Sequence, residues 1–386
     1  MDITDLKNAI VAYIDAHRTE LTELCLKIHA NPELGFREDK AANWLTGYLE
    51  ANGFSIERGI CEIPTAFRAV YGKGKPSIAF LAEYDALPGV GHACGHNIIG
   101  TSALGAGIAA KLAADKYPGT IQVIGTPAEE LIGGKIIMSE RGAFKDLDAA
   151  MLTHPGVMDT ATSQALACIT LEVEFFGKAT HAAAEPEAGR NALEAMILSF
   201  NAVNSLRQHI KPSARIHGII TDGGEAANIV PSHSAGNFLV RAEDDTYLNE
   251  MKKRVLDCFT GAATATGTRL DYRWKNYYAP MHNNMTLGRT FQQNMTALGR
   301  NALLEELHKS PGSTDMGNVS QIVPSIHSYI AITSPGTAFH SIEFAAAAAS
   351  EMGIKSMLDA AKTMAMTAAD LLANPELMTQ IKAEFK

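Results

Sequence analysis

Apolar residues at helical spacing predict that the chain begins with helices. They recur every three, four or seven positions, with polar residues on the opposite face, at Ile3, Leu6, Ile10, Ile14, Leu21, Leu24 and Ile28. A second helical segment covers residues 38–53 and ends on Gly53, a residue type that commonly terminates helices.

From residue 77 the pattern changes to short apolar runs, which predict buried strands. Three such runs cover residues 77–85, 120–130 and 149–156, and small residues over 97–115 predict a helix after the first. This alternation is typical of an α/β fold with a mostly parallel sheet. The alanine-rich tail over residues 344–373 is also predicted to be helical.

Residues 166–277 carry another pattern, that of an inserted domain. Its predicted elements are strands over 167–178, 214–224, 234–243 and 268–276, and helices over 190–209 and 245–267. The resulting order, βαββαβ, is that of a ferredoxin-like fold. We therefore predict a discontinuous α/β domain of residues 1–165 and 278–386, with a ferredoxin-like domain inserted at residues 166–277.

Composition narrows the class of protein. Of the 386 residues, 46% are apolar, which suits a substantial core, and the net charge of −9 without a Lys/Arg cluster argues against a nucleic-acid partner. The N-terminus lacks the pattern of a signal peptide, and no run of about 18 apolar residues predicts a membrane span. Five scattered cysteines without a CxxC pair indicate a reducing compartment, so we expect a cytoplasmic protein with no membrane partner.

Potential metal ligands follow the ends of the predicted strands. Asp85, Cys94 and His96 follow the first run, Glu129 and Glu130 end the second, and His154 lies in the third. Ligands of open α/β sheets bind at the carboxyl ends of the strands, so these side chains are expected to converge on one edge.

Each of these residues also has a purely structural interpretation. Cys94 and His96 suit zinc, or manganese if carboxylates join them, but a buried free cysteine beside core histidines fits the pattern too. Glu129 and Glu130 are predicted to open a helix and to interact with its dipole. Alternatively, one carboxylate binds metal and the other acts as a general base.

The remaining candidates leave the same choice open. His154 and His340 are either structural or metal-binding. Asp85 is either a turn carboxylate or the partner that holds a histidine ligand in one tautomer.

Motifs occur in a consistent order between about residues 20 and 350: HANPELGFRE, DALP, HACGH, GTPAEE, HAAAEPEAGRNALEA, AANIVP and GTAFH. In this combination the chain resembles the co-catalytic metallopeptidase family of aminoacylase, glutamate carboxypeptidase, succinyl-diaminopimelate desuccinylase and the auxin-conjugate amidohydrolases. It is most similar to the amidohydrolase branch. The CGHN form, with STDMGNVS later in the chain, looks most like its dipeptidase and aminobenzoyl-glutamate hydrolase members.

This resemblance implies roles for individual residues. The ligands of a two-metal centre holding Zn²⁺ or Mn²⁺ would be Cys94, His96, Glu130, His154 and His340. Glu129 would be the general base, and His181 would reach the partner subunit's active site to stabilise the oxyanion. Asn228 and Arg241 would contact the substrate. Arg241 would bind the carboxylate of the substrate, although a surface arginine at the end of a strand fits the pattern too. Asn97 departs from the Asp usual in that branch, and an amide cannot supply the charge of a carboxylate.

Taken together, these features predict a metal-dependent amidohydrolase that cleaves dipeptides or N-acyl amino acids. The inserted domain would form a homodimer and close over the substrate. A cysteine hydrolase, with Cys94 as nucleophile and His92 or His96 as base, is the first alternative. A non-catalytic metal-binding protein is the second, although it would give Glu129 no role.

Overall fold

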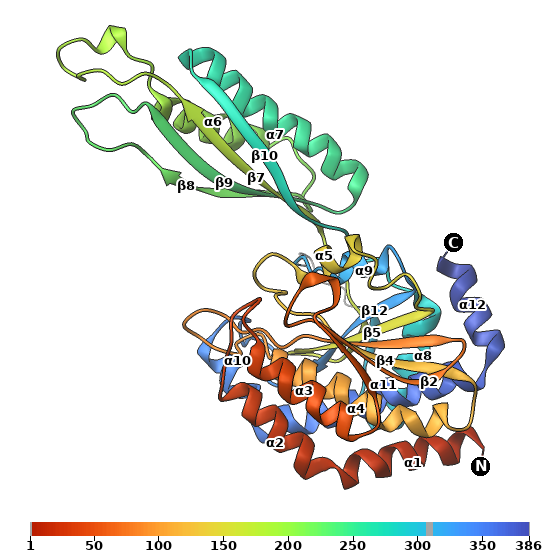
Figure 1. Ribbon diagram of the computed structural model, residues 1–386. Coiled ribbons are helices and arrows are strands. Elements are labelled where there is room, and N and C mark those ends of the chain that lie inside the picture. Colours follow the sequence, from red (N-terminus) through yellow and green to blue (C-terminus); the bar gives the residue numbers. More distant parts are fainter. Residues whose placement is uncertain (1, 306–311, 386) are drawn as a thin grey trace. The chain divides into compact units, whose positions relative to one another are not determined.

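The computed structural model describes residues 2–305 and 312–385, and this part of the chain forms two compact units (Figure 1). The first unit comprises the described residues of 1–164, 281–308 and 315–386. The second comprises those of 165–280 and 309–314. The second unit therefore consists mainly of the segment 165–280, inserted into the first unit, with a short second segment.

The first unit is built on an eight-stranded sheet in the order β1-β2-β4-β3-β5-β12-β6-β11. The strands are β1 (Ser55–Arg58), β2 (Phe67–Lys73), β3 (Ser77–Ala82), β4 (Gly119–Gly125), β5 (Ala149–Gly156), β6 (Thr160–Thr162), β11 (Leu303–Glu305) and β12 (Ser325–Ala331). The central strands β4, β3, β5 and β12 run parallel, whereas β1 and β2 are antiparallel at one edge. The predicted α/β class with a mostly parallel sheet is confirmed.

Helices cover both faces of this sheet because its central strands are apolar on both sides. Ile78 and Phe80 of β3 belong to the core shared with α4 (His96–Ala114) and α11 (Glu351–Ala373). The alternate residues Ala79 and Leu81 pack on the other side, in a core shared with α5 (Gly134–Glu140) and α9 (Met316–Ser320). Figure 1 shows the two groups of helices on opposite sides of the sheet.

The remaining helices of the first unit surround these layers. They are α1 (Ile3–Ala16), α2 (Arg18–His29), α3 (Asp39–Ala51), α8 (Met285–Ala297), α10 (Ile342–Ala347) and α12 (Pro375–Phe385). Within the described part, α4 alone has the length and composition to cross a membrane. In the protein, 83% of the most apolar 18-residue stretch of this helix is buried, as is typical of a core helix.

Two predicted helices differ in the structure. Glu129 and Glu130 do not open a helix but lie in a turn, and α5 begins only at Gly134. The cause is Ala128, whose φ of 61° breaks the helical path and whose carbonyl accepts hydrogen bonds from the N–H groups of Gly133 and Gly134. The alanine-rich tail is split into α10 and α11 because the Ser350 hydroxyl caps a new helix by accepting a bond from the Gly353 N–H.

The second unit has the predicted βαββαβ order and its own core. Its elements are β7 (Ala167–Phe176), α6 (Ala192–Arg207), β8 (Arg215–Asp222), β9 (His233–Ala242), α7 (Asp245–Thr266) and β10 (Arg269–Tyr278). The strands form an antiparallel sheet in the order β10-β7-β9-β8. Alternate residues of β7, such as Leu171 and Val173, pack against Met196 of α6 and Phe259 of α7.

Candidate metal centre

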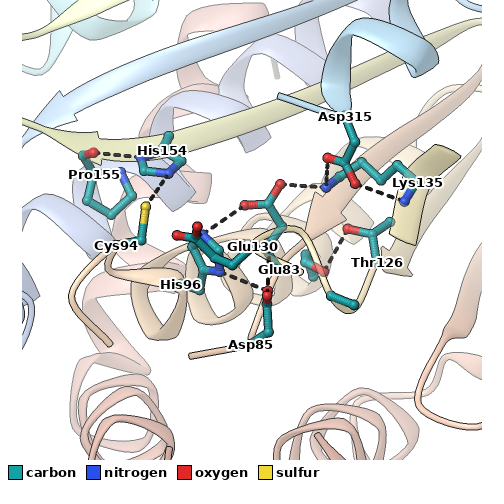
Figure 2. A network of polar contacts seen from close by, with 12 residues as sticks. Glu83, Asp85, Cys94, His96, Thr126, Glu130, Lys135, His154, Pro155 and Asp315 are labelled. Carbon is teal, nitrogen blue, oxygen red and sulfur yellow. Dashed lines mark hydrogen bonds and ion pairs between the residues drawn. The ribbon is translucent and has the colours of Figure 1, made fainter. Parts of the chain in front are cut away.

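The carboxyl ends of the parallel strands carry a cluster of metal-binding residue types. Cys94 and His96 lie at the N-terminus of α4, Glu129 and Glu130 in the turn after β4, and His154 near the end of β5. The loop after β12 supplies His340. These are the ends at which open α/β sheets bind ligands, and Figure 2 shows several of these side chains pointing toward one another.

Three overlapping groups of potential ligand atoms occur here, and within each group the atoms lie within 4.8 Å of one another. The groups are Cys94 with His96 and His154, Cys94 with Glu130 and His340, and His96 with Glu129 and Glu130. The expected convergence is therefore what the structure has. Because Cys94, His96 and Glu130 each belong to two groups, the three groups form one continuous cluster.

Two histidines are held so that Nε2 faces the cluster. The Nδ1 atom of His96 lies 2.9 Å from Asp85 Oδ1, and the Nδ1 atom of His154 lies 2.6 Å from the Pro155 carbonyl oxygen. In the neutral imidazole, a proton on Nδ1 satisfies these contacts and leaves the Nε2 lone pair for a metal ion. For Asp85, this geometry matches the tautomer-fixing role rather than that of a turn carboxylate alone.

The turn after β4 brings two carboxylates to the same place. The Glu130 N–H donates to Asp85 Oδ2 at 3.0 Å, which ties the turn to the loop after β3. Glu130 Oε1 lies 3.2 Å from His340 Nε2 and 4.0 Å from His96 Nε2. His340 itself has a φ of 63°, and its N–H donates to the Ala93 carbonyl, so its loop is fixed against the segment that carries Cys94.

Burial and charge shift the ionisation of these groups. Burial raises the pKa of the Cys94 thiol well above its ordinary value and lowers the pKa of His154 to about 4. Burial also disfavours the charged form of His96, but the nearby Asp85 carboxylate has the larger effect, so the pKa of His96 is raised. Burial, together with the nearby carboxylates of Glu83 and Asp315, raises the pKa of Glu129.

The donor set fits a divalent metal ion. Thiolate, imidazole and carboxylate ligands are those that zinc and manganese take in proteins. Among the described residues, His96 Nε2 is a buried atom without a hydrogen-bond partner, so it is free to bind an ion. The Cys94 Sγ and His154 Nε2 atoms lie 3.4 Å apart, a separation that one ion can bridge.

A buried ion-pair network beside the cluster was missed at the sequence level. Lys135 Nζ lies 2.6 Å from Glu83 Oε1 and 2.7 Å from Asp315 Oδ1, and the Lys135 N–H donates to Asp315 Oδ2 at 2.9 Å. All three side chains are almost completely buried, and Figure 2 shows Glu83 between Lys135 and His96. The sequence signal for this network is Glu83 itself, a charged residue within an apolar run. Its partners Lys135 and Asp315 are too distant in the sequence to be identified from the pattern.

Asn97, which departs from the family pattern, points away from the cluster. Its side-chain NH₂ donates to Cys25 Sγ at 3.2 Å and to the Ala348 carbonyl oxygen at 3.0 Å. A carboxylate could not donate to that carbonyl, so the amide matches its surroundings. This residue joins α4 to α2 and to the segment between α10 and α11.

The three predicted residues of the inserted segment belong to the second unit. His181 and Asn228 lie side by side, because His181 bridges to Ile229 and the Ala182 N–H donates to the Asn228 carbonyl. Arg241, on β9, donates from Nη1 to Ser313 Oγ at 2.7 Å. Their roles toward a substrate stay predictions.

Comparisons with known proteins identify the family. The family model described as Peptidase family M20/M25/M40 matches residues 79–369. Xaa-Arg dipeptidase of Mus musculus is 38% identical over 398 residues, covering 99% of this chain and 92% of that protein. A p-aminobenzoyl-glutamate hydrolase subunit of Escherichia coli (strain K12) is 31% identical over 449 residues, covering 96% of this chain and 93% of that protein.

A solved structure has the same fold. It is that of a dinuclear metal-binding peptidase of the M20 family from Bacillus subtilis, with a TM-score of 0.73 and 20% identity, covering 93% of this chain and 99% of the other. The family match spans most of the chain, and two full-length relatives are hydrolases by name. The chain therefore belongs to peptidase family M20/M25/M40, and it is a hydrolase that acts on amide bonds.

Proposed function

We propose that this protein is a dipeptidase or N-acyl amino acid amidohydrolase that uses two divalent ions, Zn²⁺ or Mn²⁺, per subunit. The observation that carries the proposal is the convergence of Cys94, His96, Glu129, Glu130, His154 and His340 in overlapping groups of ligand atoms. The names of the relatives, an Xaa-Arg dipeptidase and an aminobenzoyl-glutamate hydrolase, support an amide beside a free amino-acid carboxylate.

The ligands in this proposal are Cys94, His96, Glu130, His154 and His340. When bound, divalent ions supply Lewis acidity to the scissile carbonyl and lower the pKa of a water nucleophile. Asp85 keeps His96 in the tautomer that leaves Nε2 free, and the Pro155 carbonyl does the same for His154.

Glu129 is the general base in this mechanism. It removes a proton from the attacking water and delivers it to the amine of the departing amino acid. Burial and the neighbouring carboxylates raise the pKa of its carboxyl group, which makes the deprotonated carboxylate a stronger base. Glu130, hydrogen-bonded to His340, has a lowered pKa despite its burial and stays charged as a ligand.

A cysteine hydrolase is less well supported by the geometry. The predicted bases are His92 and His96, and the structure adds His154, whose Nε2 atom lies 3.4 Å from Cys94 Sγ. Burial, however, raises the pKa of the thiol, lowers the pKa of His92 to about 3 and lowers the pKa of His154 to about 4, so proton transfer from the thiol to either imidazole is unfavourable. The raised pKa of His96, which the Asp85 carboxylate causes against the effect of burial, favours the imidazolium form, and that form cannot accept a proton. Cys94 and His154 are better suited to binding a metal, which displaces the thiol proton.

The second unit has a substrate-related role in this proposal. His181 stabilises the oxyanion in the active site of a partner subunit, while Asn228 and Arg241 contact the substrate, as the family resemblance implies. This requires a homodimer formed through residues 166–277, which also act as a lid over the site. We further propose a cytoplasmic location, consistent with the free cysteines of the described chain.

The test is amide hydrolysis by metal-free and metal-reloaded protein. Dipeptides ending in arginine, aminobenzoyl-glutamate and N-acyl amino acids are incubated with chelator-treated protein, before and after addition of Zn²⁺ or Mn²⁺. We expect amino-acid release only after metal is added. Release that is indifferent to metal would favour Cys94 as nucleophile, and no release from any substrate would favour the non-catalytic alternative.

The variant Glu129→Gln tests the base. We expect kcat to fall by about 10²–10⁴-fold, the usual contribution of a general base, while metal content stays that of the unaltered protein. Metal content is measured by mass spectrometry of the dialysed protein. The matched control Glu140→Gln, at an exposed glutamate at the end of α5, should keep full activity. An active Glu129→Gln variant would remove Glu129 from the mechanism.

A further inference from the structure

Glu83 presents an unused carboxylate oxygen to the metal-binding side of His96. Its Oε2 atom lies 3.5 Å from His96 Nε2, and both side chains are at most 1% exposed. Among the described residues neither atom has a hydrogen-bond partner, although a buried polar atom without one costs free energy. Two such atoms facing each other indicate a missing third partner.

The other oxygen of Glu83 is firmly held. Oε1 accepts from Lys135 Nζ at 2.6 Å, and Lys135 is in turn bound by Asp315 through both its ammonium group and its N–H. Lys135 lies in α5 and Asp315 immediately precedes α9, so these two elements hold the carboxylate on the side away from His96 (Figure 2). The ion pair between Oε1 and Lys135 thus holds the carboxylate with Oε2 toward His96.

The charges of this group do not balance. Lys135 supplies one positive charge against the two carboxylates of Glu83 and Asp315, and Glu129 and Glu130 lie nearby. Buried carboxylates without a cation are strongly unfavourable. A divalent ion next to Oε2 would supply the missing positive charge.

The spacing suits a shared ion. Two nitrogen or oxygen ligands about 2.1 Å from one zinc ion at the tetrahedral angle are about 3.4 Å apart. The observed 3.5 Å between Glu83 Oε2 and His96 Nε2 agrees with that separation. The competing arrangement is an ion pair between Glu83 and a protonated His96, in which Nε2 could not bind metal.

We infer that Glu83 is a further metal-binding residue of this centre, sharing an ion with His96, and that Lys135 and Asp315 position its carboxylate. The inference rests on the proposed function, because it requires that the centre binds divalent ions.

Metal affinity of three variants tests the inference. Zn²⁺ binding to metal-free protein is measured by competition with a chromophoric chelator, and the number of bound ions by mass spectrometry. We expect Glu83→Gln, which leaves Lys135 its Asp315 partner, to weaken one site by about 10–100-fold, the loss usual when a supporting group of a metal site is removed. Asp315→Asn removes only a positioning carboxylate and leaves Glu83 Oε2 facing His96, so it should lower the affinity clearly less than Glu83→Gln does.

The outcomes separate the possibilities. If Glu83 instead forms an ion pair with protonated His96, Glu83→Gln should bind zinc as tightly as the unaltered protein or more tightly, because His96 would then hold its competing proton less strongly. That result would overturn the inference. Equal losses in Glu83→Gln and Asp315→Asn would also overturn it, since the ion-pair network alone would then matter. His96→Ala serves as the reference: if neither it nor the unaltered protein binds zinc, the proposed function itself fails.

A second measurement requires no variant. A crystal structure of the zinc-loaded protein, with the ion located by anomalous scattering, gives the distance from the ion to Glu83 Oε2. A distance of about 2.0–2.2 Å supports the inference. An ion bound by His96 but clearly beyond that distance from Glu83 would contradict it, whatever the variants show.

Discussion

Single buried charges in this protein depend on their immediate partners. Lys135 is completely buried, which by itself favours the neutral amine, yet the carboxylates of Asp315 and Glu83 outweigh burial and raise the pKa of Lys135. Such a lysine stays charged because of its carboxylate partners. The metal-binding region therefore depends on a residue that is itself not a ligand.

Replacing Lys135 tests this dependence. Lys135→Met fills similar space but leaves two buried carboxylates without a cation, so we expect the free energy of unfolding to fall by about 3–5 kcal/mol. Urea denaturation followed by circular dichroism measures the loss. Lys75→Met is the control, because Lys75 is 62% exposed in its ion pair with Asp148, and should change stability by less than about 1 kcal/mol. Equal losses in the two variants would show that burial of the pair is unimportant.

Between elements, the contact of α4 with β5 sets the spacing of the ligands. Gly95 is the N-cap of α4, has a φ of 75°, and separates Cys94 from His96. A Cβ atom at this position would lie 2.7 Å from Cγ of Pro155, the residue after His154 on β5. Only glycine combines that backbone conformation with that close approach.

Gly95→Ala should therefore damage both stability and metal binding. We expect unfolding free energy to fall by about 1–3 kcal/mol, because the helix must move away from β5. Zinc affinity should fall with it, since Cys94 and His96 would shift relative to His154. Gly47→Ala in α3 is the control: a Cβ there meets nothing within 4 Å, so the change should stabilise by about 0.5–1 kcal/mol.

The turn that carries Glu129 is tied to α3 through a buried carboxyl group. Glu38, the residue before α3, accepts hydrogen bonds from the Ala128 N–H at 2.8 Å and from the Thr65 hydroxyl at 2.9 Å. Burial raises the pKa of Glu38 from 4.5 to about 7. Between these two values the folded protein binds more protons at this residue than the unfolded chain, so its contribution to stability falls as pH rises.

Glu38→Gln should flatten that dependence. The amide keeps an acceptor for the Ala128 N–H and can donate to the Thr65 hydroxyl, but it does not titrate. We expect the free energy of unfolding of the variant to change less than that of the unaltered protein between about pH 4.5 and pH 7. Denaturant titrations at a series of pH values measure the slope. Glu50→Gln, at an exposed residue of α3, should leave the slope unchanged.

In the whole molecule, the two units have separate hydrophobic cores. The cores around α4 and α5 consist of residues from the first unit, whereas the core around β7, α6 and α7 consists of residues from the second. The candidate ligands all belong to the first unit. Metal binding is therefore expected to stabilise one unit selectively.

Hydrogen exchange followed by mass spectrometry tests this selectivity. Removal of metal should increase amide exchange in β3, β5 and α4, but not in β7 and β9. An ion present at 100 times its dissociation constant stabilises the state that binds it by about 2.7 kcal/mol, which exchange readily detects. An equal increase in both units would mean that they unfold together.

Much of the fold follows from local sequence pattern, but the site only in part. The runs at residues 77–85 and 149–156 form β3 and β5 because each is apolar on both faces. The pattern at Glu129 predicts a helix start instead of a turn, because the left-handed conformation of Ala128 depends on distant contacts, among them the one with Glu38. The Glu83–Lys135–Asp315 network joins three elements, and no local pattern indicates which charges will meet.

The position of β12 has a consequence for the order in which the chain folds during synthesis. This strand pairs with β5 on one side and β6 on the other, yet it follows both, and the whole second unit, in the chain. While a ribosome completes residues 165–324, β5 lacks one neighbour, although all eight of its residues are buried in the finished protein. The inserted unit can close its own core first. Until β12 is synthesised, the sheet of the first unit has an unpaired apolar edge at which incorrect strand pairing can occur. The candidate metal centre is completed later still, because His340 follows β12 in the chain.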